Sequence, residues 1–178
     1  MSVKAKNIQT WVNIPKQYTA EERKAIALEI LNFIRERSAQ GVDVNGSAFK
    51  GYSKEYMKSL DFKNAGKGRT PNLQLSGDML AAIKLLDSER GRIKIGYDTG
   101  DSEAGRAEGN QIGSYGQPTG NKAKARPFIG IKKEHLKKIL EAFPLSDDET
   151  RRDSTENALA ADYASTDTVD ELFGGDDG

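Results

Sequence analysis

The sequence predicts a domain that contains both helices and strands, joined by long loops and followed by an acidic tail. Apolar residues recur at helical spacing from Ile26 to Ile34, whereas Ile93, Ile95 and Tyr97 alternate with polar residues and glycine as in a half-buried strand. The chain has 178 residues, of which 36% are hydrophobic and 30% charged. This length suits one domain plus an extension, and this composition is too polar for complete packing. We expect an N-terminal arm at 1–18, a domain at 19–145 and an extended or disordered acidic tail at 146–178.

The first predicted helix begins after Tyr18. Thr19 and Glu22 have the spacing of a capping box, in which the hydroxyl and the carboxylate each bind a backbone amide at the helix start. An apolar stripe follows on one face, opposite charged residues, and Gly41 is suited to end the helix. The stripe consists of Ile26, Ala27, Ile30, Leu31, Phe33 and Ile34.

A long basic loop is predicted between Gly41 and Pro71, with one helical turn around residues 52–60. Aromatic residues are interleaved with its cations, which makes it a candidate contact for an acidic partner. The same composition suits single-stranded nucleic acid, although the spacing matches no specific module. The candidate contact residues of this loop are Lys50, Tyr52, Lys54, Tyr56, Lys58, Lys63 and Arg69.

A second helix is predicted over residues 76–87, with Ser76 as its cap. A strand over residues 92–97 follows. The glycine-rich stretch after it, up to Ala125, predicts a second long loop that holds a helical turn or a strand edge at 107–112. Tyr115 in this loop is a further candidate contact. The buried face of the helix would consist of Met79, Leu80, Ile83 and Leu86.

Residues 126–131 are predicted to form a strand that holds the domain together. Pro127 lacks an amide hydrogen, which is tolerated at a strand start or edge. Phe128 is suited to fill the core, Gly130 allows close backbone approach, and Arg126 can bind a neighbouring carboxylate or carbonyl. A helix over residues 132–143 follows, apolar on one face and rich in lysine on the other. Its apolar face consists of Leu136, Ile139, Leu140 and Phe143.

The net charge of zero conceals an uneven distribution. Residues 146–178 hold eleven Asp and Glu residues and two Arg residues, so the tail carries nine net negative charges and the body nine positive ones. A basic body is typical of a nucleic-acid surface or of subunits that meet by complementary charge, whereas the tail acids could simply keep that segment soluble. Amphipathic stretches at 158–163 and 169–173 are suited to docking on a neighbour, with Leu172 and Phe173 as contacts.

The sequence contains no recognisable catalytic or cofactor-binding motif. It has no cysteine, and its single histidine, His135, lies on a lysine-rich face where an ordinary exposed histidine is expected. The glycines around Lys67 lack the hydroxyl residue and the preceding strand of a phosphate-binding loop. No run approaches the roughly 20 apolar residues of a membrane span. We expect a protein that works by shape and contact, without enzymatic activity, cofactor, metal or membrane.

Four motifs occur in an order that resembles the tailed-phage virion-morphogenesis or tail-completion proteins, a family of neck and head-tail joining proteins. They are YSKEY at 52–56, LSGDML at 75–80, the strand at 92–97 and ARPFIGI at 125–131. The resemblance covers roughly residues 20–143. The loop around Tyr115 departs from the family's pattern, and the tail after Pro144 has no counterpart in it.

The resemblance implies an α+β domain, with helices packed on a small antiparallel sheet. It further implies a homo-oligomeric ring, commonly of six copies, that completes the tail or neck and docks tail to head in the virion after synthesis in the host bacterial cytoplasm. Expected partners are other copies and other neck and tail proteins, such as a connector or adaptor, a tail terminator or the tail tube. In a ring, basic bodies can bind the acidic tails of neighbours. The alternative function is a DNA-binding or DNA-packaging accessory protein that uses the basic body.

Overall fold

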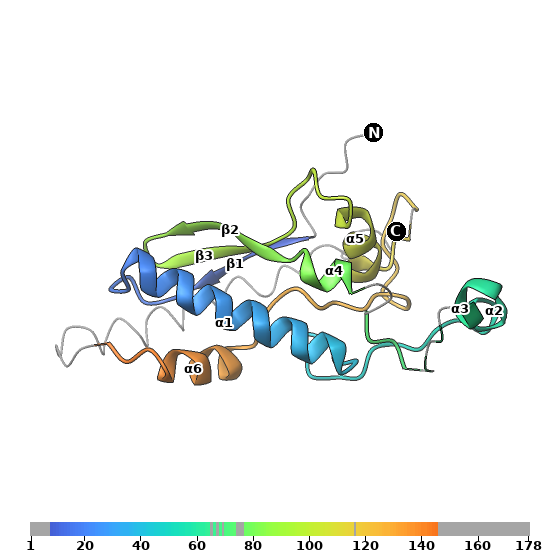
Figure 1. Ribbon diagram of the computed structural model, residues 1–178, viewed down its shortest axis with the longest axis horizontal. Helices are drawn as coiled ribbons and strands as arrows, with labels where there is room; N and C mark the ends of the chain where they lie inside the picture. Colours follow the sequence, from blue (N-terminus) through green and yellow to red (C-terminus); the bar gives the residue numbers. More distant parts are fainter. Residues whose placement is uncertain are drawn as a thin grey trace, which may run out of the picture.

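The computed structural model describes residues 8–64, 66, 68, 70–73, 77–115 and 117–145. Within these residues the fold is α+β, as predicted: a three-stranded antiparallel sheet has helices α1 and α6 on one side (Figure 1). The predicted tail, which includes Leu172 and Phe173, lies outside the described residues. Arg69 lies outside them as well. The elements in chain order are β1 (Gln9–Asn13), α1 (Ala20–Ala39), α2 (Lys54–Lys58), α3 (Leu60–Asn64), α4 (Asp78–Ala81), β2 (Lys84–Glu89), β3 (Arg92–Gly96), α5 (Ala104–Ile112) and α6 (Lys133–Glu141).

The central strand of the sheet is β3, which was predicted from its alternation. It pairs with β1 on one side and with β2 on the other, and Ile93 and Ile95 on its inner face are fully buried. Strand β1 corrects the expectation of an N-terminal arm, because Ile8, Val12 and Ile14 belong to the core. Positions 8, 12 and 14 lie on one face of the strand with Thr10, and Gln9, Trp11 and Asn13 lie on the other. The strand pattern is therefore present in the sequence but is short.

Helix α1 runs along the sheet and begins as predicted. The Glu22 amide donates to the Thr19 Oγ1 at 3.2 Å, and the Thr19 amide donates to the Glu22 carboxylate at 2.7 Å. Its buried face carries Ile26, Ile30 and Ile34. Gly41 follows the helix with φ +79°, and a Cβ there would lie 2.8 Å from the Pro71 carbonyl oxygen, so glycine is required at this position.

The predicted helix at 76–87 is wrong beyond its first turn. Helix α4 ends at Ala81, and residues from Lys84 onward pair with β3 as strand β2. The register shifts between Leu85 and Asp87, and this bulge breaks the two-residue alternation that would have marked a strand. The predicted cap, Ser76, lies outside the described residues.

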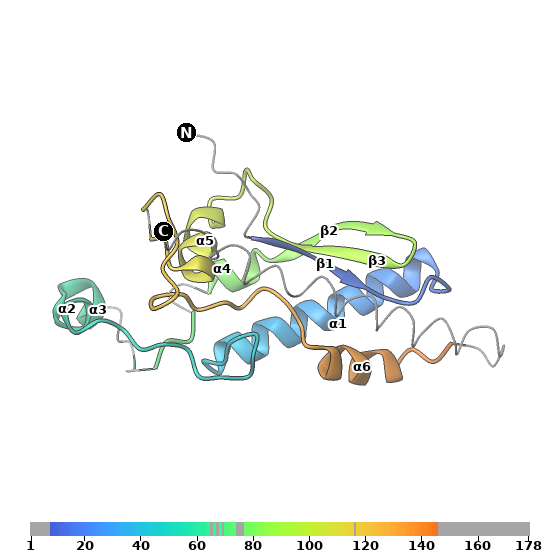
Figure 2. The same ribbon diagram turned by 180° about the vertical axis from the view of Figure 1, so that it is seen from behind.

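Helices α5 and α6 enclose the other parts of the core. Helix α5 is longer than the turn expected at 107–112, and Ala104 and Ala107 are its buried alanines. Helix α6 forms within the predicted range of 132–143; it lies beside α1 and buries Leu136 and Leu140 (Figures 1 and 2). His135 is half-buried rather than exposed, because its ring centroid lies 4.7 Å from that of Phe33. In the part of the chain that the structure describes, no helix is long and apolar enough to cross a membrane.

Candidate assembly interface

Residues 126–131 are not a strand, contrary to the prediction. The amides of Phe128 and Ile129 both donate to the side-chain oxygen of Gln111, at 3.0 and 3.1 Å. The guanidinium group of Arg37 donates to the Phe128 carbonyl at 2.5 Å and to the Gly130 carbonyl at 3.1 Å. Because side chains satisfy these backbone groups, the segment is held in the core without a neighbouring strand.

This segment nevertheless contributes a buried side chain to the core and contacts the loop after α1. Phe128 is fully buried and meets the Tyr97 ring edge-on, with a centroid separation of 6.3 Å. The Pro127 carbonyl accepts a hydrogen bond from the Val44 amide at 2.9 Å. Gly130 has φ +136°, and a Cβ there would lie only 3.0 Å from a Val44 methyl group. The segment therefore joins the loop after α1 to the core.

Arg37 is a structural residue that the sequence analysis missed. It is only 6% exposed, and burial lowers its pKa to about 10, so it remains charged at neutral pH. The signal was available: Arg37 follows Ile30 and Ile34 at helical spacing, so a cation occupies a position of the apolar stripe. Such a placement indicates an arginine with acceptors inside the fold.

Arg126 joins two surface segments that are far apart in the sequence. Its guanidinium group donates to the carbonyls of Lys50, at 2.8 Å, and Gly51, at 3.1 Å. It also donates to the Tyr115 hydroxyl at 2.6 Å, and its Cζ lies 5.1 Å from the centre of the Tyr52 ring. We call this set of contacts the Arg126 latch. It uses the planar fork of donors that distinguishes arginine from lysine.

The inner side of the latch is anchored on α5. The Arg126 amide donates to the Asn110 carbonyl at 2.6 Å, and the Tyr115 hydroxyl lies 3.2 Å from the Asn110 side-chain oxygen. Burial raises the pKa of Tyr115, although Arg126 acts in the opposite direction, so the hydroxyl is protonated at neutral pH. Tyr115 can therefore donate to Asn110 while it accepts from Arg126.

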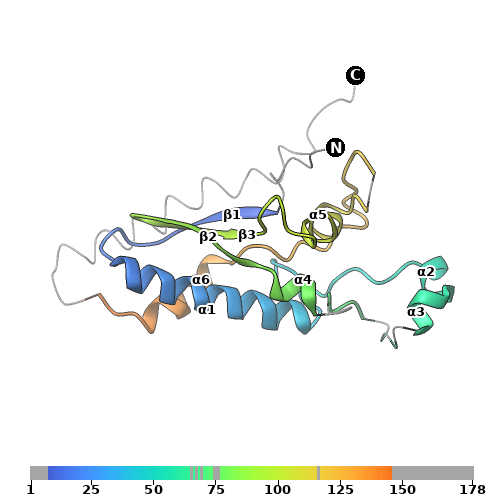
Figure 3. The same cartoon turned by 45° about the horizontal axis from the view of Figure 1, so that its top comes forward.

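Beyond the latch, residues 51–64 form a projection that stands away from the body in all three ribbon views (Figures 1, 2 and 3). It consists of α2, α3 and the segment leading into them. The rings of Tyr52, Tyr56 and Phe62 pack against one another with centroid separations of 5.3 to 5.5 Å. None of the residues in these two described helices is buried. The projection is thus ordered by its own small aromatic cluster.

The surface of the projection is mixed in character. Leu60 is 73% exposed, so the projection offers an apolar side chain to solvent. Glu55 and Asp61 partly offset the cations, so the projection is less basic than the loop composition suggested. The structure gathers Lys54, Tyr56, Lys58 and Lys63 on the projection and places Lys50, Tyr52 and Tyr115 at its base, beside Arg126.

The described residues define an α+β protein with an exposed projection. Among them, no group of three His, Cys, Asp or Glu side chains is placed to hold a metal ion. No protein-family model, curated protein or solved structure matches the chain.

Proposed function

We propose that this chain is a structural protein of the phage neck, which assembles as a ring and docks tail to head. The observation that carries the proposal is the projection, held off the body by the Arg126 latch. Isolated helices of five residues are not stable in water. A chain that orders two of them outside its core, with Leu60 exposed at 73%, has a surface suited to covering by a partner.

A ring supplies such a partner in a simple way. In a head-to-tail ring, each copy offers one surface to its neighbour and receives a different surface from the other side. A projection that fits the body of the next copy meets this requirement. The same geometry would serve contact with other neck or tail proteins.

The motifs of the resemblance support the same assignment. The YSKEY motif at 52–56 opens the projection, and the ARPFIGI motif at 125–131 supplies Arg126. The contact of Arg126 with the Tyr52 ring and with the Gly51 carbonyl brings these two distant motifs together. The second and third motifs correspond to α4 and β3, although residues 75 and 76 lie outside the described residues.

The nine net positive charges of the body favour DNA binding as the second candidate function. The acids on the projection weigh against this candidate, because a phosphate-binding surface is normally depleted of carboxylates. Gel-shift titration of a chain truncated after Leu145 separates the two candidates. Tight, salt-dependent binding would favour the DNA-binding alternative, and absence of a shift at low salt would count against it.

The decisive experiment uses particles made from the genome that encodes the chain. We expect mass spectrometry of purified virions to detect the protein. We expect a Leu60→Glu variant to accumulate unjoined heads and tails in electron micrographs. The matched control is Leu28→Glu, since Leu28 is also exposed, at 58%, but lies on α1. Absence of the wild-type protein from the particle would overturn the proposal. Equal effects of the two variants would show that the projection is not the surface that joins tail to head.

A further inference from the structure

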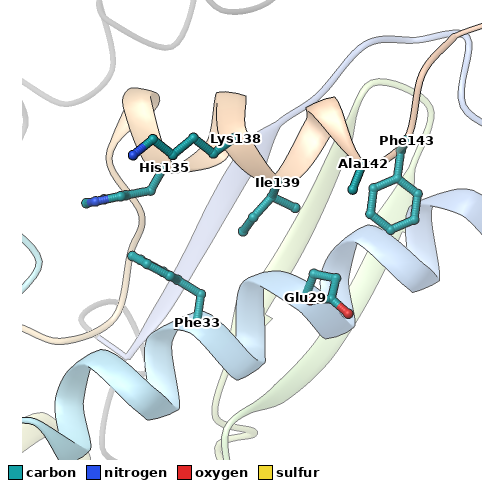
Figure 4. A pocket seen from close by; sticks show the side chains of 7 residues that line it. All are labelled: Glu29, Phe33, His135, Lys138, Ile139, Ala142 and Phe143. Carbon is teal, nitrogen blue, oxygen red and sulfur yellow. The ribbon is translucent and has the colours of Figure 1, made fainter.

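A groove runs between α1 and α6, on the side of the domain away from the sheet. Figure 4 shows Phe33 from α1 pointing toward His135 of α6, with Ile139, Ala142 and Phe143 further along the groove. The groove has a volume of about 390 Å³. Phe33, Ile139 and Phe143 are only partly buried, so apolar walls remain open. An occupant would need large apolar side chains to cover them.

The charges around the groove add a second requirement. Lys138 lies on the α6 wall, and α6 and its cap expose further lysines at 132, 133 and 137. Glu29 faces the groove from α1, while Glu134 and Glu141 offset part of the charge on α6. Helix α6 with its cap thus holds four lysines against Glu134 and Glu141, although only Lys138 among these lysines lines the groove. A fitting occupant combines apolar residues with neighbouring acids.

The chain itself contains a segment with this chemistry. Residues 169–173 read Val-Asp-Glu-Leu-Phe, with two adjacent acids next to two large apolar residues. The other amphipathic stretch, at 158–163, has a single acid, and half of its residues are alanine, so it offers fewer large apolar side chains and less charge. We propose that residues 169–173 dock in the groove between α1 and α6 of the same molecule, with Leu172 and Phe173 against its apolar walls and Asp170 and Glu171 toward the α6 lysines.

The position of the segment along the chain supports docking within one molecule. Phe143 lines the groove, and only residues 144–168 separate it from the segment. An extended chain of about 25 residues spans at most roughly 90 Å, which is more than enough to turn back to α6. Tethering on this scale gives an effective concentration in the millimolar range. The same tether makes the chain's own segment a stronger competitor for the groove than the tail of a neighbour.

Cross-linking in the full chain tests the docking directly, because the sequence contains no cysteine that could interfere. The test variant carries Ala142→Cys, at an exposed groove position, and Gly174→Cys, next to Phe173. The control pairs Ala142→Cys with Ala158→Cys. The control closes a shorter loop, so random collision would favour it over the test pair. We expect the test pair to form its intramolecular disulfide at least tenfold faster than the control pair.

Two further variants show whether the stated side chains are responsible. Leu172→Ala with Phe173→Ala should reduce the rate of the test pair to that of the control pair. Asp170→Lys with Glu171→Lys should slow it severalfold at low salt. Equal rates for the test and control pairs would overturn the proposal, and so would cross-linked dimers in place of monomers. The measurement uses isolated dilute protein, so its outcome is independent of whether the chain belongs to a virion.

Discussion

Arg37 and Arg126 both bind backbone carbonyls, Arg37 inside the core and Arg126 at the surface. Arg37 extends from α1 to the carbonyls of Phe128 and Gly130. Arg126 extends from the loop before α6 to the carbonyls of Lys50 and Gly51. The chemistry is the same, but Arg37 is 6% exposed, whereas Arg126 is only half-buried.

The difference in burial decides what each arginine contributes. Without Arg37, two carbonyls would remain in the core with no donor, and such unsatisfied groups cost free energy of folding. Without Arg126, water can reach the carbonyls at the base of the projection and replace the lost donors. We therefore infer that Arg37 stabilises the fold, whereas Arg126 sets the position of the projection.

The largest expected effect lies in the segment that Arg37 holds. Phe128→Ala would empty a fully buried site against Tyr97 and should lower the free energy of unfolding by about 3–5 kcal/mol. Urea denaturation followed by circular dichroism measures the change. Leu28→Ala, at an exposed position on α1, should change stability by less than about 0.5 kcal/mol. Normal particles from the Phe128→Ala variant would count against the family assignment.

Arg37→Ala should rank second. It leaves the Phe128 and Gly130 carbonyls without their donor, which should lower the free energy of unfolding by about 2–4 kcal/mol. Its neighbour Glu36 is exposed, so Glu36→Ala provides a matched control on the same helix. A loss below about 1 kcal/mol for Arg37→Ala, within the range of an average hydrogen bond, would remove the distinction between the two arginines.

Arg126→Ala should affect position more than stability. We expect a loss of less than about 1 kcal/mol in the free energy of unfolding, since water can solvate the released carbonyls. Amide hydrogen exchange of residues 52–64 should accelerate at least tenfold while exchange in α1 stays unchanged. Arg126→Lys should give a similar acceleration, because an ammonium group cannot reproduce the fork of donors. A destabilisation equal to that of Arg37→Ala would contradict this view of the latch.

The smallest expected effect concerns Tyr115 in alkaline solution. Burial raises its pKa, so the folded protein keeps this hydroxyl protonated at pH values where the unfolded chain, with an ordinary value of about 10, loses the proton. The corresponding stability is fully present below pH 10 and is lost as the pH rises above it. The difference between the phenolate absorbance titrations of the wild type and Tyr115→Phe should have its midpoint above pH 10. A midpoint at or below 10 would show that the hydroxyl is not held in the latch.

The parts of the fold that the sequence predicted are those whose periodicity is uninterrupted. Helix α1 keeps helical apolar spacing from Ile26 to Ile34, and strand β3 and helix α6 keep their periods as well. Strand β2 was mistaken for helix because of its bulge at Leu85 and Asp87. The irregular segment at 126–131 depends on side chains of Arg37 and Gln111, and no local pattern encodes such distant hydrogen bonds.

The candidate site was predicted residue by residue but not as an arrangement. The basic aromatic loop indicated Tyr52 and Tyr56, and the resemblance indicated Arg126. That Arg126 reaches the loop at Lys50 and Gly51 follows only from the path of the chain in space. Nor did the composition show that the rings of Tyr52, Tyr56 and Phe62 would pack against one another.

The projection occupies the connection between α1 and α4, and this placement bears on how the protein can change over evolution. The entropic cost of closing a loop grows slowly, by about 0.6 kcal/mol for each doubling of its length. Insertions or deletions beyond Gly51 therefore leave the strand pairing and the carbonyls bound by Arg37 untouched. A change in the size of the projection would therefore spare the sheet, and under the proposed function it would change the surface offered to a partner.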